Sequence, residues 1–246
     1  MSTGSGGPGD DVRKRFFKIR WEANQFPVSG VWKVRRRLAD AMRAVIEKLI
    51  TSDAPEKELE IAAERLEEYA ERLASHPHRQ RYLGFSEAAV ADPDAENTPP
   101  DGGGHFDFSP LIGRSNPLAP PIEMTSDEDD TVHGTVNFGS AYEGPPGCVH
   151  GGYIAAAFDE VLGYAETFSG QPGMTGTLTT RYRTPTPLHT ELRFEARVDR
   201  IEGRKIFVSG TLHAGDRLCA EADAIFISSH PGVFAKLLAE RNARQP

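Results

Sequence analysis

The sequence predicts an α+β fold in which antiparallel strands wrap around one buried helix, with an α-helical extension before them. Three observations predict it. Two N-terminal segments repeat apolar residues at helical spacing, and five segments after residue 130 show the β-branched alternation of strands. Between the first and second of these strands lies a segment that is apolar on nearly every side, as a helix buried against a sheet would be.

The composition excludes several classes of protein. The chain has 246 residues, of which 38% are apolar and 26% are charged, so it can bury a core and is not disordered as a whole. Its net charge of −8 disfavours non-specific binding to nucleic acid. Cys148 and Cys219 cannot build a disulfide framework. The sequence has no run of about 18 apolar residues, so stable insertion into a membrane is not expected. We therefore expect a soluble, cytoplasmic protein.

The first 83 residues divide into a tail and a helical extension. Residues 1–11 are rich in Gly and Ser and are expected to form a disordered tail with no signal peptide. Residues 12–83 contain two apolar stripes at helical spacing, separated by a break at 51–55. The sequence thus predicts an antiparallel helical hairpin. Its two stripes consist of Val31, Val34, Leu38, Met42, Val45 and Leu49, and of Leu59, Ala62, Leu66, Tyr69 and Leu73.

The segments that flank the predicted sheet have a different character. Residues 84–120 are rich in Pro, Gly and acidic residues and are expected to form a linker before the domain at 121–230. Residues 231–246 are expected to form a C-terminal helix or tail. Basic residues within 13–37 alternate with aromatic ones, so this stretch could touch anionic lipid or nucleic acid, but a solvated helix face with aromatic anchors explains it more simply.

The predicted domain holds five strands and one helix. The strands cover residues 131–138, 176–183, 191–201, 205–213 and 218–228, and the short turns between them predict that the last four form an antiparallel meander. The apolar helix, Gly151–Phe168, lies between the first strand and the second. Just before it, residues 143–152 form a glycine-rich loop. Glycines at this junction let a ligand approach the backbone, and the helix start can stabilise negative charge on a phosphate or a carbonyl oxygen.

Two carboxylates on the apolar helix are the candidate chemical groups. Asp159 follows Gly152 by seven residues and returns to within about 20° of the same helix face. Glu160 lies about 80° from Gly152 around the helix and is expected to be more easily solvated. Seven residues also separate Gly152 and Asp159 by roughly 10 Å along the axis, too far for both to act on one atom. A second helix across a two-fold axis would bring Asp159 of one chain to Gly152 of the other, which predicts a site shared within a dimer.

The stretch Gly147–Asp159, with His150-Gly151-Gly152 at its centre, resembles the motif of hotdog-fold acyl-CoA thioesterases. It is most similar to the phenylacetate-pathway type and to thioesterase superfamily members 4 and 5. The resemblance continues through residues 181–188 and 198–209 and covers about 120–230. It implies a hotdog fold, a homodimer or a dimer of dimers, and hydrolysis of acyl-CoA with no cofactor beyond the coenzyme A of the substrate.

The resemblance also implies roles for individual residues. The backbone N–H of Gly152 would polarise the thioester carbonyl as an oxyanion hole, with Gly151 beside it in the substrate-binding loop. His150 would orient that loop or lie beside the thioester. Asp159 of the partner chain would be the nucleophile or the general base. A Thr on the following strand would hydrogen-bond this carboxylate or the water, and Thr175 fits that place.

Other residues complete the predicted site. Thr177, two residues beyond Thr175, is expected on the same strand face as a substitute for it. The CoA phosphates need cations near the tunnel mouth, and the candidates are Arg183, Arg204 and Lys205. No metal site is expected, because the histidines of the domain lack the spacing of metal ligands and no cysteine pair accompanies them.

Two other classes of function compete with hydrolysis. A hotdog hydratase would add water to an enoyl-CoA, but it uses an Asp and a His on a short segment with Asn-Pro, and no segment of that kind occurs. A non-catalytic acyl-CoA-binding or regulatory protein would keep the fold but has no need of Asp159. A triad of Cys148, His150 and Asp159 is disfavoured, because Asp159 lies too far along the helix.

Overall fold

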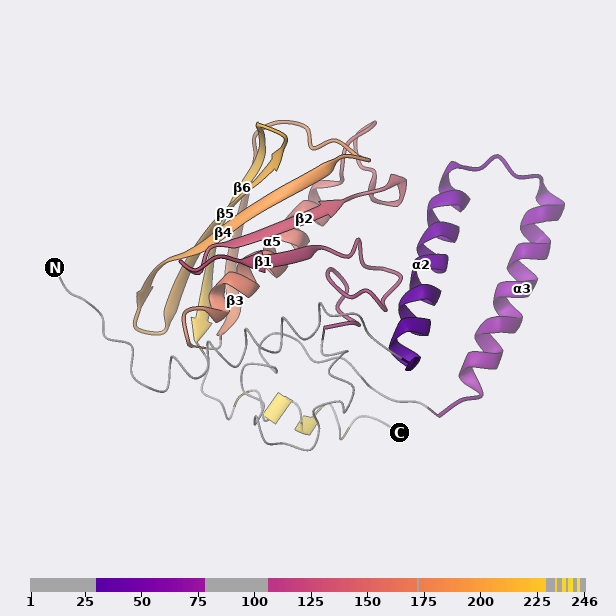
Figure 1. Cartoon of the computed structure of the whole chain (residues 1–246), viewed down its shortest axis with the longest axis horizontal. Coiled ribbons are helices and arrows are strands. Elements are labelled where there is room, and N and C mark those ends of the chain that lie inside the picture. Colours follow the sequence, from indigo (N-terminus) through magenta and orange to yellow (C-terminus); the bar gives the residue numbers. More distant parts are fainter. Residues whose placement is uncertain are drawn as a thin grey trace.

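The computed structural model describes residues 30–77, 106–171 and 173–228, and residues 233, 236, 237, 239, 240 and 243 (Figure 1). The predicted tail at 1–11, residues 12–29 and 78–83 of the predicted extension, residues 84–105 of the predicted linker and most of the predicted C-terminal helix or tail lie outside this part of the chain. The basic and aromatic stretch at 13–37 is thus described only from residue 30. The predicted α+β class is confirmed, since a six-stranded antiparallel sheet packs against one helix and a helical extension precedes both.

The sheet contains the five predicted strands and one more. In chain order the strands are β1 (Glu123–Ser126), β2 (Val132–Asn137), β3 (Gly173–Tyr182), β4 (Glu191–Glu202), β5 (Lys205–Ala214) and β6 (Arg217–Ser228). Their order across the sheet is β1-β2-β4-β5-β6-β3, and every neighbouring pair is antiparallel. The additional strand, β1, has only four residues and pairs with β2 at the edge.

The predicted four-strand meander is wrong in one respect. Strands β4, β5 and β6 follow one another, but β3 pairs with β6 at the far edge and not with β4. The chain between β3 and β4 therefore crosses the end of the sheet. On its way it contacts the loop before the central helix, where Thr186 O accepts from Val149 N–H at 2.9 Å and Leu188 N–H donates to Gly147 O at 3.1 Å. The crossing connection thus fixes the glycine-rich loop.

The predicted buried helix is confirmed as α5 (Gly151–Thr167), which lies across one face of the sheet (Figure 1). Its side chains Ile154, Phe158, Val161 and Leu162 are fully buried and belong to the main core. The ring of Phe158 packs edge-on against Phe194 of β4, with ring centres 5.1 Å apart. Burial of this apolar surface is the main force that holds the helix against the sheet.

Residues 106–120 are not a linker, although the sequence predicts one over 84–120. Phe106 and Ile112 are buried in the main core, and Asp107 and Ser109 are fully buried as well. The composition of the segment is typical of a linker because it is rich in Gly, Pro and polar residues. Its polar groups are instead satisfied locally, for example by the hydrogen bond from Ser115 Oγ to Asp107 Oδ2 at 2.7 Å.

The predicted helices of the extension are confirmed as α2 (Gly30–Thr51) and α3 (Glu56–Ala74). Helix α2 docks on the sheet domain through two arginines, of which Arg36 belongs to the basic stretch that is expected to form a solvated face. Arg36 donates two hydrogen bonds to the buried carboxylate of Asp107, at 2.6 and 3.0 Å, and Arg43 donates to Asn116 O at 2.7 Å. Within the described ranges, none of the helices is long and apolar enough to cross a membrane.

Candidate active site

The start of α5 is capped by the side chain of His150. Its Nδ1 accepts a hydrogen bond from Gly152 N–H at 3.0 Å, so the neutral ring carries its proton on Nε2. The Gly152 N–H, which the family resemblance implies as the oxyanion donor, therefore already donates a hydrogen bond. In the described part of the chain the Gly151 N–H has no such acceptor. The helix thus presents Gly151 rather than Gly152 as its open donor.

Tyr182 completes this end of the site and was not predicted from the sequence. Its hydroxyl donates to Gly151 O at 2.7 Å, and its ring lies against Gly151 Cα, where an added Cβ would approach Tyr182 to 3.2 Å. Tyr182 pairs with Ala220, which is fully buried on the helix side of β6. The strand alternation that predicted β3 could have placed Tyr182 toward the helix, since facing residues of antiparallel strands share a side.

The predicted contact between Thr175 and Asp159 is present. Thr175 Oγ1, on the first part of β3, donates to Asp159 Oδ1 at 2.8 Å. Asp159 is otherwise exposed to solvent along the open side of α5. A carboxylate that is oriented by one hydrogen bond and open to solvent is available to a substrate or to a water molecule.

The two neighbouring carboxylates of α5 have environments opposite to those expected. Glu160, predicted to be solvated, is half-buried and accepts a hydrogen bond from Ser109 Oγ at 2.8 Å. Burial raises the pKa of Glu160 to about 7, although the Ser109 hydrogen bond works in the other direction. Asp159 is the exposed group. The error arose because residues 106–115, read as linker, cover the Glu160 side of the helix.

Thr177 does not share a face with Thr175, contrary to the prediction. The register of β3 against β6 shifts between these two residues, because Thr175 pairs with Phe226 and Thr177 with Ile225. Phe226 is buried on the helix side and Ile225 alternates with it, so the bulge at Gly176 turns Thr177 to the outer face. Gly176 suits this place because an added Cβ would lie 2.9 Å from Ile227.

The three predicted phosphate-binding cations are not brought together. Arg183 follows the last residue of β3 and forms an ion pair with Glu221 at 2.6 Å. Arg204 is in the turn before β5, where it donates to Ser228 O at 3.0 Å, and Ser228 pairs with the first residue of β3. The two arginines therefore lie at opposite ends of β3, about 30 Å apart. Arg204 and its neighbour Lys205 lie at the Thr175 end.

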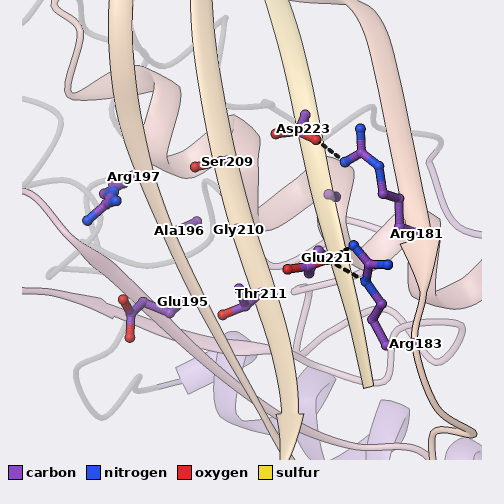
Figure 2. A pocket seen from close by; sticks show the side chains of 11 residues that line it. Arg181, Arg183, Glu195, Ala196, Arg197, Ser209, Gly210, Thr211, Glu221 and Asp223 are labelled. Atoms are coloured by element: carbon purple, nitrogen blue, oxygen red, sulfur yellow. Dashed lines mark hydrogen bonds and ion pairs between the residues drawn. The ribbon is translucent and has the colours of Figure 1, made fainter. Parts of the chain in front are cut away.

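A hollow of about 410 Å³ lies on the outer face of the sheet, where Arg183 points (Figure 2). It is lined by opposite charges, among them Arg181, Arg183, Arg197, Glu195, Glu221 and Asp223. Figure 2 shows the ion pairs that Arg181 makes with Asp223 and Arg183 with Glu221. The hollow contains neither Asp159 nor the start of α5, so it is separate from the candidate active site.

A third carboxylate of α5, Glu166, is buried near the end of the helix. It is 4% exposed, and its Oε1 has no hydrogen-bond partner within the described residues. Burial raises the pKa of Glu166 to about 8, while a hydrogen bond from the Gly173 backbone lowers it in part. The side chain is therefore held protonated in the folded protein at neutral pH.

This protonation predicts a loss of stability as the pH rises. The folded-state pKa of Glu166 lies above the unfolded value, so its contribution is fully present below about pH 4.5 and is lost as the pH rises toward about 8. The free energy of unfolding should fall by a few kcal/mol, on the order of 1.4 per pKa unit, between pH 5 and 9. The isosteric Glu166→Gln variant should lack this component in urea titrations. Identical pH slopes for the two proteins would contradict the prediction.

Among the residues that the structure describes, no group of three His, Cys, Asp or Glu side chains gathers as a metal site would require.

Comparison with known proteins places these residues in a family. The sequence profile of the thioesterase superfamily matches residues 146–221, which run from the loop before α5 into β6. Acyl-coenzyme A thioesterase THEM4 of Xenopus laevis is 39% identical over 95 residues, which are 38% of this chain and 43% of THEM4. Human acyl-coenzyme A thioesterase THEM5 is 31% identical over 107 residues, 44% of this chain and 41% of THEM5. The matched region thus spans less than half of these relatives.

Two further similarities cover nearly whole proteins. PA0474 of Pseudomonas aeruginosa, a candidate esterase by name, is 31% identical over 125 residues, which are 48% of this chain and 92% of PA0474. A thioesterase superfamily protein of known crystal structure is 33% identical, with a TM-score of 0.69, and the likeness covers 82% of this chain and 97% of that one. The expected resemblance is thereby confirmed, and this chain belongs to the thioesterase superfamily.

Proposed function

We propose that this protein hydrolyses an acyl-CoA thioester to a free acid and coenzyme A. The observation that carries the proposal is the Asp159–Thr175 pair, an oriented and solvent-open carboxylate on the helix whose first turn offers a free N–H. The names of the relatives THEM4 and THEM5 support acyl-CoA as the substrate class. Free thiols at Cys148 and Cys219 are compatible with the cytoplasm as the compartment.

Each active site draws on two chains in this proposal. Eight residues separate Gly151 from Asp159, about 12 Å along the axis of α5, so the two cannot act on one carbonyl within a chain. Strand β3, which carries Thr175, is an edge of the sheet, and no other strand of the described residues pairs with its second side. Pairing of two β3 edges across a two-fold axis would cover both edges and set Asp159 of one chain near Gly151 of its partner. The active unit is then a homodimer or a dimer of dimers.

The chemical step follows from these positions. The Gly151 N–H at the helix start stabilises the oxyanion that forms when the thioester carbonyl is attacked. Asp159 either attacks the carbonyl directly or takes a proton from the attacking water, and Thr175 holds the carboxylate in place. Attack by Asp159 gives a mixed anhydride, which water then hydrolyses to the free acid, whereas attack by water gives the free acid directly. In both cases the coenzyme A thiolate leaves and is protonated, and one water molecule is consumed. Arg204 and Lys205, at the Thr175 end of the sheet, are the cations proposed for the CoA phosphates.

Release of free thiol from acyl-CoAs of increasing chain length, aliphatic and aromatic, tests this function directly. Hydrolysis of at least one member by wild type, and its loss in Asp159→Asn, is the expected result. Binding of acyl-CoA without turnover would support the non-catalytic alternative instead. Hydration of an enoyl-CoA, seen as loss of its double-bond absorbance with no thiol release, would support the hydratase.

Removing the Thr175 hydroxyl is expected to slow hydrolysis about 10- to 100-fold, since a hydrogen bond to a charged group contributes roughly 1.5–3 kcal/mol. The variant is Thr175→Val, which keeps the shape of the side chain, and kcat is the quantity to measure. The matched control is Thr177→Val on the outer face of the same strand. Equal losses in both variants would show a general effect on β3 and not the loss of the Asp159 hydrogen bond.

A further inference from the structure

Among the described residues, the α2–α3 hairpin contacts the sheet domain through one face of α2. Trp32, Arg36, Arg43 and Glu47 follow one another at spacings of four, seven and four and so lie on one side of the helix. The Arg35 guanidinium lies beside them, 5.8 Å from the ring centre of Phe108. Arg36 and Arg43 bind the 106–120 segment, while Glu47 accepts hydrogen bonds from Ser140. The opposite side of α2 therefore faces away from the sheet domain.

That opposite side is the apolar stripe found in the sequence. Val34 and Leu49 expose 64% and 62% of their surface, and Val31, Met42 and Val45 are exposed as well. Helix α3 does not cover them, because none of its own side chains is buried and its stripe residue Leu66 is 50% exposed. Figure 1 shows the two helices as an antiparallel pair beside the sheet domain. Within the described ranges, two apolar stripes on neighbouring helices are thus exposed at the same time.

The stripes have the pattern of helices that pack on other helices. On α3 the residues Leu59, Ala62, Leu66, Tyr69 and Leu73 recur at spacings of 3-4-3-4, the repeat of a coiled-coil seam. A contiguous exposed apolar stripe along a helix of a monomer marks an interaction site. Because the seam is narrow and flanked by charges, the spacing fits a partner helix better than a flat surface.

The charges of α2 and α3 indicate which kind of helix would pack on each of them. Helix α2 carries six basic side chains against two acidic ones, and α3 carries seven acidic against three basic. Each hairpin is therefore self-complementary. Two copies related by a two-fold axis place α2 of one chain beside α3 of the other, so that apolar seams face inward and opposite charges flank them.

We propose that the α2–α3 hairpin is a self-association surface, covered by the hairpin of a second copy of this chain in an antiparallel four-helix bundle. The hairpin lies beside the 106–120 segment and the turn after β2, near the β1 edge, and β3 is the opposite edge of the sheet. The bundle is thus a second interface, separate from the β3 edge, and it does not rest on the proposed hydrolysis.

The molar mass of the full chain in solution tests the proposal. Leu59→Gln, Leu66→Gln and Leu73→Gln together remove the α3 seam, and all three residues are already exposed, so the fold of a single chain has no packing to lose. Light scattering after size exclusion should give this variant half the molar mass of wild type. The matched control, Glu64→Gln with Glu68→Gln on the far side of α3, should keep the wild-type mass.

Three results would overturn the proposal. An unchanged mass in the seam variant would show that the stripes are covered within the chain. A seam variant and a control that dissociate equally would show that the seam is not the determinant. A monomeric wild type that sediments with phosphatidylglycerol vesicles would show that lipid and not a second copy covers the seam. Circular dichroism of each variant reports helix content, and thiol release is measured separately.

Discussion

Replacing Asp159 with asparagine is expected to lower acyl-CoA hydrolysis by at least about 10²-fold while the protein stays folded, as is typical of losing a general base or nucleophile. Asparagine has the same shape, and its amide oxygen can still accept the hydrogen bond from Thr175. Asp159 is exposed and belongs to no ion pair in the described part of the chain, so its charge contributes little to stability. Thiol release under saturating acyl-CoA measures the loss, and thermal unfolding confirms the fold.

The neighbouring carboxylate provides the control for this prediction. Glu160→Gln removes a charge one residue away, but Glu160 points to Ser109 and is turned about 100° from Asp159 around the helix. We expect its hydrolysis to stay within about tenfold of wild type, since the group lies outside the reacting set. Near-wild-type turnover in a folded Asp159→Asn, with a large loss in Glu160→Gln, would transfer the catalytic role to Glu160.

The different burial of Asp159 and Glu160 could not be predicted from the sequence alone. Helical periodicity placed Asp159 and Glu160 on different faces of α5, and that placement holds. The expectation that Glu160 is the more easily solvated of the two depended on which segments cover each face. Local periodicity carries no information about the 106–115 segment, which lies more than 40 residues earlier in the chain and packs on Glu160 through Ser109.

Other differences have the same cause. The alternation of polar and apolar residues predicted five strands, but the position of β3 at the far edge is set by its pairing with β6 over a long separation. Thr177 was assigned to the wrong face because a bulge at Gly176 interrupts the alternation. The sequence predicts the apolar stripe of α2 correctly, yet the helix docks through its basic side, where Arg36 forms an ion pair with the buried Asp107.

The second large effect is expected at the start of α5. Gly151→Pro removes the one backbone N–H that the structure leaves open there, and loss of an oxyanion donor costs about 10²–10³ in kcat. Proline fits the place, because Gly151 is the first residue of the helix and His150 before it has φ −61° and ψ 131°, the extended conformation that precedes proline. The measurement is again thiol release, with helix content followed by circular dichroism.

Gly151→Ala is the matched control, since it introduces the same Cβ beside Tyr182 but keeps the N–H. If both variants lose activity equally, crowding against Tyr182 and not the donor explains the loss. If Gly151→Pro keeps near-wild-type turnover, the donor is the Gly152 N–H, released from His150 when substrate binds.

The same variant also decides whether one site uses two chains. After subunit exchange between Gly151→Pro and Asp159→Asn proteins, a mixed dimer should hold one site with both lesions and one with neither, because the two-fold axis pairs Gly151 of each chain with Asp159 of the other. Activity should therefore return to as much as about half of wild type per mixed dimer. Within a single chain the two groups lie about 12 Å apart along α5, so a site built from one chain would regain nothing. Confirmed exchange without recovered activity would exclude the shared site.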